Sequence, residues 1–269
     1  MGILTIDNFE QVSNSLLQFD RDGEFYMVLV LKRRKDTKGK MAEGVNEGNR
    51  LIKHFFVYDK EYFENKKDAI IALCEQNNAR AYIIPQRRDC RLVLWCLHNT
   101  VSVILKEGSM NVHFDHLIRS CVAGMHETME KWHKRWMIDI DEDDPTLKLW
   151  IEEGRRHLND IGYENTFLYS VVKYAMYLRD LIGNALIPID GCRSEEAEEF
   201  MPSLNHEYGV DDVQLLQTPH GWHLVTPPFN REQKAMDKYF RGFAPKSEWI
   251  KPDAMALLYA PATITTEGE

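Results

Sequence analysis

The sequence predicts an α+β fold made of two modules, and three observations lead to this expectation. Segments with strand-like alternation and segments with helical spacing follow one another along the 269 residues. The hydrophobic content of 44% and the charged content of 28% are those of an ordinary globular chain. The C-terminal half reads as a strand, helices, two short strands, a helix and a last strand. We expect an N-terminal α/β module at 1–130 packed on a C-terminal module at 131–269; one compact unit is the alternative.

The N-terminal module is predicted from strands on either side of a basic loop. "FYMVLVLKRR" (25–34) and "RLIKHFFVY" (50–58) have strand composition, and the loop between them predicts a long hairpin connection. "KKDAIIALCEQNN" has helical spacing, and "ARAYIIPQRR" alternates like a strand that Pro85 ends. Residues 92–131 are expected to be mostly helical.

The C-terminal module is predicted to start with a strand at 134–141. Helices are expected to follow at 147–158, 166–182 and 195–204. "VQLLQTPHGWHLVT" predicts two short strands, 213–218 and 222–226, joined by a tight Pro-His-Gly turn. A helix at 231–240 and the strand "AMALLYA" come after them. Without the helical insertion the order is β-α-β-β-α-β, the ferredoxin-like or RRM-like arrangement, which makes the first and third strands neighbours.

Two aspartates interrupt the apolar strand in "RWMIDIDEDD". Because side chains alternate in an extended chain, Asp139 and Asp141 are expected on one face, about 7 Å apart. Two carboxylates repel each other unless a cation lies between them, and a hard divalent ion fits that position. The pattern is equally typical of a strand that runs into an acidic turn, since Glu142, Asp143 and Asp144 follow.

His223 is expected beside the two aspartates, because the predicted topology makes its strand the neighbour of theirs. Helices should cover only one face of such a sheet. The open face is then where a functional site can lie. The alternative is a half-buried histidine in a hairpin with no further role.

The D-x-D strand and the hairpin "TPHGWHLVT" together resemble the archaeo-eukaryotic primase family, which includes primase-polymerases and many phage and plasmid primases. That family carries an apolar-D-x-D motif, then a small-x-His motif after a Gly-containing hairpin, then a third acidic residue on or near a later strand. "MIDID" matches the first motif and "GWH" the second, and the resemblance covers roughly the C-terminal half. The third acid has no clear counterpart: Glu248 is the first candidate, then Asp253, with Asp237 inside a predicted helix.

The resemblance implies a metal-dependent nucleotidyltransferase of phage or mobile-element replication. Asp139, Asp141 and Glu248 would be catalytic and would hold Mg²⁺ or Mn²⁺ against a nucleoside triphosphate and the attacking 3′-hydroxyl. His223 would contact the phosphates of the nucleotide. Basic side chains would neutralise the charge of phosphate or of a single-stranded DNA template, and the candidates are Arg88 and Lys251, with Arg80 and Arg87.

Two other functions fit parts of the sequence. A catalytically inactive relative would keep the fold and bind nucleic acid or a host protein. "HLVT" at 223–226 also matches the H-apolar-x-T signature of two-histidine phosphoesterases, but the required second copy has only a poor candidate at His98. Metal dependence separates the three, because only the polymerase requires divalent ions.

The net charge of −9 argues against a protein that coats nucleic acid by bulk attraction. A nucleic-acid enzyme with this charge needs a local basic patch. The runs "KRRKDTKGK" (32–40), "RR" (87–88) and "KWHKR" (131–135) offer one, although each is also typical of a solvated loop or strand end.

The cysteine pattern and the motifs that are missing from the sequence indicate the cellular compartment and the partners to expect. The five cysteines form no C-x-x-C pair, which favours reduced thiols over disulfides or zinc. The first residues lack the basic start of a secretory signal, and no apolar run reaches the length of a membrane span, so we expect a cytoplasmic protein. The sequence has no P-loop, so a helicase partner would be a separate chain.

Overall fold

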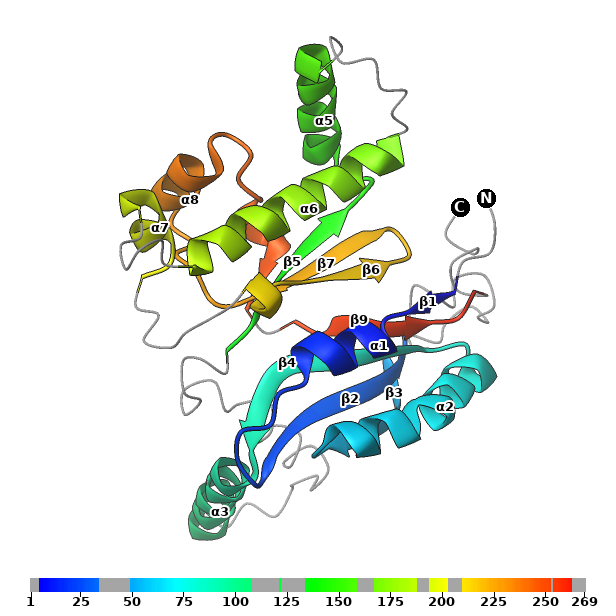
Figure 1. Cartoon of the computed structure of the whole chain (residues 1–269). Helices are drawn as coiled ribbons and strands as arrows, with labels where there is room; N and C mark the ends of the chain where they lie inside the picture. Colours follow the sequence, from blue (N-terminus) through cyan, green and yellow to red (C-terminus); the bar gives the residue numbers. More distant parts are fainter. Residues whose placement is uncertain are drawn as a thin grey trace.

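The structure, a computed structural model, describes residues 5–33, 49–107, 121, 134–158, 167–187, 194–202, 210–252 and 254–262. In these residues the chain is α+β, with two antiparallel sheets (Figure 1). The first sheet has the order β1 (Ile6–Asp7), β9 (Ala256–Ala260), β4 (Arg80–Asp89), β2 (Glu24–Lys32), β3 (Arg50–Val57). The second has the order β6 (Gln214–Thr218), β7 (Gly221–Thr226), β5 (Trp136–Asp141), β8 (Ile250–Lys251).

Helices connect these strands. They are α1 (Phe9–Gln11), continued by a π-helical turn at Val12–Leu16, α2 (Lys60–Asn77), α3 (Cys90–Glu107), α5 (Pro145–Leu158), α6 (Phe167–Leu186), α7 (Glu195–Phe200) and α8 (Gln233–Phe240). Single 3₁₀ turns lie at Val210–Asp212 and Ser247–Trp249. None of the helices in the described ranges is long and apolar enough to cross a bilayer.

Helix α2 shows how local sequence sets an element. It begins one residue after Asp59, whose carboxylate accepts a hydrogen bond from the N–H of Tyr62 (2.6 Å), as an N-cap does. It buries Phe63, Ile70 and Cys74, which recur at the spacing of one helical face. The helix ends at Asn77, and its C-cap residue Asn78 takes the left-handed conformation. The helix therefore begins about one and a half turns before the segment "KKDAIIALCEQNN" from which it was predicted.

Strand β4 corrects the expectation that Pro85 ends a strand. The strand continues to Asp89, and its pairing with β2 shifts register between Phe25 opposite Arg88 and Met27 opposite Ile84. Pro85 lies inside this irregular stretch. The N–H group that proline lacks is therefore not needed for a regular hydrogen bond between β4 and β2. A proline at a bulge therefore bends the strand without terminating it.

The strand predicted from "AMALLYA" lies in the other sheet. We expected it to complete the second sheet, but β9 pairs with β1 and β4 of the first. All five of its residues are buried, as expected for a strand that is covered on both faces. The two-residue strand β8 takes the edge position beside β5.

The second sheet lies between α6 and the first sheet (Figure 1). Ile138, Ile140 and Leu224 pack in the core on the helix side. Met137, Leu216 and Val225, on the opposite side, share a core with the first sheet. The expectation of a face left open is therefore wrong in part, because the first sheet covers that face at Met137.

Gly221 explains why β5 and β7 can approach so closely at the hairpin. The two-residue turn at 219–220 joins Thr218 to Gly221, which is the partner of Asp141 on β5. A Cβ atom on Gly221 would lie 1.9 Å from the carbonyl oxygen of Ile140. Any side chain there would push the two strands apart.

We predict that Gly221→Ala destabilises the protein by roughly 3 kcal/mol or more, because the backbone of Ile140 has no room to move. Urea unfolding would measure this loss. Gly242→Ala is the matched control: Gly242 also has a positive φ, 89°, but a Cβ there would meet nothing within 4 Å. The control should cost only about 1 kcal/mol, and equal losses would contradict the argument from close approach.

Candidate functional site

Asp139 and His223 form the centre of the candidate site. They are directly opposite each other in the antiparallel pairing of β5 and β7, so their side chains project from the same face. His223 Nε2 lies 3.3 Å from Asp139 Oδ1. The adjacency that the sequence predicted is therefore present in the fold.

His223 is also held from the first sheet. Its Nδ1 accepts a hydrogen bond from the backbone N–H of Leu257 on β9 (3.0 Å). Because Nδ1 is the acceptor, this network assigns the proton of the neutral ring to Nε2, which can then donate to Asp139. The imidazole thus connects the two sheets and orients the carboxylate.

Burial differs between the two members of the pair. The His223 side chain is only 11% exposed, whereas that of Asp139 is 34% exposed. The carboxylate can therefore meet a ligand from solvent while the imidazole supports it from within.

Asp141 lies two residues further along β5, at the exposed end of the strand. Ile138 and Ile140 are fully buried on the helix side, so alternation places Asp141 on the face of Asp139. Its backbone carbonyl accepts the N–H of Asp144 (3.2 Å), which begins the turn into α5. Two hard oxygen donors on one face suit Mg²⁺ or Mn²⁺, which proteins often hold with one or two carboxylates while phosphates and water complete the shell.

The acidic turn after β5 has a clear structural role at Asp144. Its carboxylate accepts hydrogen bonds from the N–H groups of Thr146 and Leu147, from Lys246 Nζ (3.1 Å) and from the indole of Trp249. Burial alone would raise the pKa of Asp144, but these bonds outweigh it and hold the pKa below its ordinary value. Asp144 therefore ties the start of α5 to the turn before β8.

The third-acid candidates lie elsewhere. Glu248 is in the 3₁₀ turn before β8, with its side chain 71% exposed and 3.6 Å from Lys246 Nζ. Glu248 and Asp237 line a pocket of about 270 Å³ beside Trp150. Among the described residues, no three His, Cys, Asp or Glu side chains are grouped to hold a metal, so the structure does not bring Glu248 together with the two aspartates. Asp253 lies outside the described residues.

The predicted phosphate-binding residues occupy different settings. Lys251 on β8 is opposite Met137, on the face of Asp139, and its Nζ donates to the carbonyl of Glu248. Arg80, Arg87 and Arg88 on β4 are all buried.

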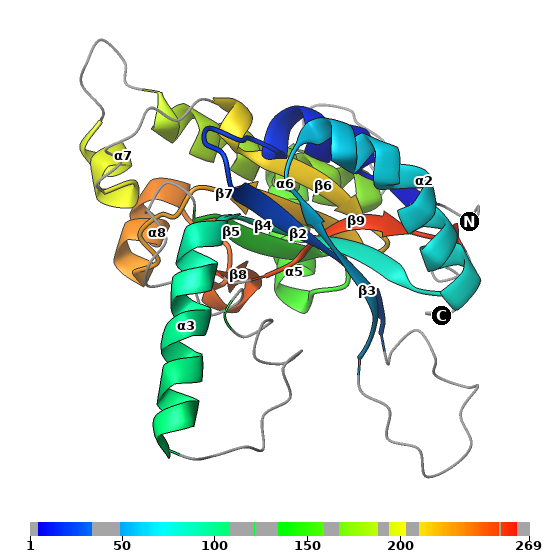
Figure 2. The same ribbon diagram turned by 90° about the horizontal axis from the view of Figure 1, so that it is seen from below.

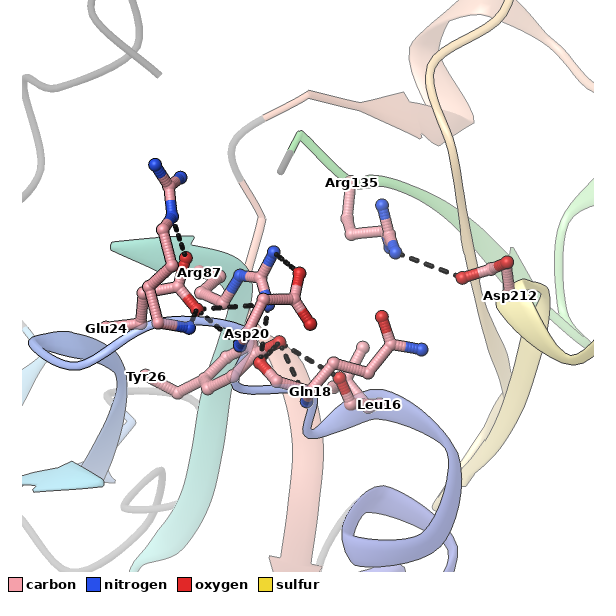
Figure 3. A network of polar contacts seen from close by, with 9 residues as sticks. Leu16, Gln18, Asp20, Glu24, Tyr26, Arg87, Arg135 and Asp212 are labelled. Atoms are coloured by element: carbon pink, nitrogen blue, oxygen red, sulfur yellow. Dashed lines mark hydrogen bonds and ion pairs between the residues drawn. The ribbon is translucent and has the colours of Figure 1, made fainter. Parts of the chain in front are cut away.

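Arg87 is part of an internal polar network (Figure 3). Its guanidinium binds Asp20 (2.7 Å) and Glu24 (3.2 Å), and it donates to the carbonyl of Gln18. Arg135, which precedes β5, instead pairs with Asp212 at 3.2 Å. These three ion pairs are intramolecular and neutralise the charges of the two arginines.

The residue that sequence reasoning missed is Leu257. It acts through its backbone N–H, so no residue type marks the role. The neighbouring bond from Asn8 Nδ2 to the carbonyl of Leu257 (3.0 Å) holds the same point of β9. Only the position of β9 in the first sheet, next to β7 of the second, reveals it.

Compared with known protein families, with curated proteins and with solved structures, the chain shows no match. The function is therefore inferred from the geometry of the site itself.

We predict that His223→Ala destabilises the protein by about 2 kcal/mol, because the buried N–H of Leu257 loses its acceptor. His223→Asn retains a side-chain acceptor and should recover part of that loss. Urea unfolding of both variants measures the difference. Equal stability of the Ala and Asn variants would show that the bond between the sheets contributes nothing.

The pH dependence of stability should reveal Asp144. A carboxyl with a lowered folded-state pKa stabilises the protein above its unfolded pKa of about 4, and this contribution is lost as pH falls through the folded-state value. Asp144→Ala should therefore cost about 1–2 kcal/mol at pH 7 and clearly less at about pH 3. Asp143→Ala, at an exposed position in the same turn, is the control and should change little. An Asp144 penalty that does not shrink in acid would contradict the role of the charge.

Proposed function

We propose that the protein is a metal-dependent nucleotidyltransferase of the DNA primase or primase-polymerase type, acting in phage or mobile-element replication. The observation that carries the proposal is the Asp139–His223 pair, with Asp141 on the same face of β5, at the junction of the two sheets. Neither aspartate has a role in the apolar core, whereas the alternate residues of the strand do.

The topology of the second sheet supports a ferredoxin-like or RRM-like module. The chain runs from β5 through α5, α6 and α7 to the hairpin β6–β7, then through α8 to β8. The spatial order β6-β7-β5-β8 places the first and third strands at the centre. This is the order of a β-α-β-β-α-β unit with β8 as its fourth strand.

Each residue then has a defined task. Asp139 and Asp141 would hold Mg²⁺ or Mn²⁺, which supplies neutralisation of the triphosphate and a more acidic 3′-hydroxyl. His223 fixes the direction of Asp139 through Nε2. Lys251, on the same face, is the cation best placed to meet phosphate, whereas Arg87 is already paired internally. Nucleoside triphosphates and a single-stranded DNA template are the substrates that this arrangement would use.

The proposal predicts metal-dependent incorporation of labelled nucleotides on single-stranded DNA, with Mg²⁺ or Mn²⁺. The double variant Asp139→Ala plus Asp141→Ala should lose at least about 100-fold of this activity, because both proposed metal ligands are removed. Asp143→Ala, in the exposed turn that follows, should retain it. Product formation by the double variant at the wild-type rate would overturn the assignment.

A second candidate is a catalytically inactive relative that binds nucleic acid or a host protein. It is favoured by one observation: in the described part of the chain, no third acidic side chain joins Asp139 and Asp141. Absence of product with either metal, together with retained binding to DNA or nucleotide, would select this candidate. The two-histidine phosphoesterase is less favoured, because His98 lies on α3, at the end of the first sheet away from β7 (Figures 1 and 2).

A further inference from the structure

Two cysteine thiols lie side by side on helix α3. Cys96 is part of this helix, and Cys121 comes 21 residues after Thr100 of the same helix. The thiol of Cys121 hydrogen-bonds to that of Cys96, and its Sγ atom also lies 3.9 Å from Thr100 Oγ1. Thr100 donates to the backbone carbonyl of Cys96 (2.8 Å), one helical turn earlier, so both contacts of Cys121 are made with one face of α3.

The two thiols differ in exposure. Cys121 is only 2% exposed, whereas Cys96 is half-buried, on a helix that extends away from the strands (Figure 2). Burial raises the pKa of the Cys121 thiol, and its hydrogen bond with Cys96 raises that pKa further. Since the thiolate is the reactive form and needs access to the oxidant, Cys96 is the thiol that a small oxidant attacks first.

The other described cysteines lack this arrangement. Cys74 is fully buried, and burial raises its pKa to about 12, as expected of an inert thiol in a core. Cys90 is half-buried at the start of α3, where burial and the neighbouring Asp89 raise its pKa. Within the described part of the chain, no second thiol acts on either of them. The pairing of Cys96 with Cys121 is therefore specific.

We propose that Cys96 and Cys121 are a site of reversible oxidation, at which hydrogen peroxide produces an intramolecular disulfide. This inference does not depend on the proposed function, because neither thiol belongs to the face of Asp139. In the structure both thiols are free, so the disulfide is the product of the reaction and not the resting state.

The reaction has two steps. The Cys96 thiolate attacks one oxygen of the peroxide, the O–O bond breaks, hydroxide leaves and Cys96 becomes a sulfenic acid. The sulfur of Cys121 gives up its proton, attacks the sulfur of Cys96 and expels the sulfenic oxygen as hydroxide, which is protonated to water. Two thiols and one peroxide thus become one disulfide and two waters. An added dithiol reverses the change by thiol–disulfide exchange.

The test uses the full chain, reduced, freed of reductant and then exposed to a small excess of hydrogen peroxide. Peptide mass spectrometry without reduction should find the peptides of Cys96 and Cys121 joined, two hydrogens lighter than their sum. Thiol titration in denaturant should show that two of the five thiols are lost and that dithiothreitol restores them. This measurement needs no variant.

Three variants assign the roles of the thiols. In Cys121→Ser, Cys96 should stop at the sulfenic acid, which dimedone traps. In Cys96→Ser, Cys121 should be oxidised at least about 10-fold more slowly than Cys96 is in the wild type, because it is buried and protonated. Cys90→Ser is the matched control, since Cys90 is half-buried on the same helix, and it should form the link at the wild-type rate. Thermal melting followed by circular dichroism verifies that each variant is folded.

Three results would overturn the inference: no joined peptide from the oxidised wild type, a disulfide between two chains in place of one within a chain, or an unchanged loss of two thiols in Cys96→Ser. If a serine variant does not fold, the mass spectrum of the wild type still decides.

Discussion

Hydrogen bonds between the two sheets are the constraint on which the rest of the structure depends. The backbone N–H of Leu257 in the first sheet donates a hydrogen bond to Nδ1 of His223 in the second sheet. Side-chain amides make three more bridges to backbone carbonyls: Asn8 to Gln217, Gln11 to Leu215, and Gln86 to Arg135. A buried group that loses its partner costs about 1–3 kcal/mol, so the sheets cannot shift relative to each other without losing several such contributions together.

This junction also determines where the carboxylate of Asp139 becomes accessible to solvent. Met137 on β5 is buried against the first sheet. Asp139, two residues further along the same face of β5, is one-third exposed, so the first sheet no longer covers β5 at this point. His223 lies at that point, with one nitrogen turned to β9 and the other to the carboxylate. A change at β9, far along the chain from Asp139, would therefore reach the site through one imidazole ring.

Sequence reasoning succeeded where local rules decide the outcome. The alternation of "MIDID" sets the face of Asp139 and Asp141, and the two-residue hairpin at 219–220 sets the pairing of β6 with β7. That β7 and its His223 lie beside β5 followed from the predicted β-α-β-β-α-β topology. Placing β9 requires long-range information, although the unbroken apolar run 256–260 indicates a strand buried on both faces. Glu248 was predicted to join the two aspartates, but it lies in a 3₁₀ turn, where the alternation of a strand no longer sets the direction of a side chain.

The distribution of charge, more than its total, decides which surfaces of this acidic protein can attract an anion. Arg87 is paired with Asp20 and Glu24, and Arg135 with Asp212, so these cations contribute little field outside the protein. Charges more than about 10 Å apart are screened at moderate salt, so the overall charge of −9 does not decide binding at one surface. The electrostatic field at the face of β5 is therefore set by local groups, among them the partly exposed carboxylate of Asp139 and the exposed Lys251, and less by the net charge.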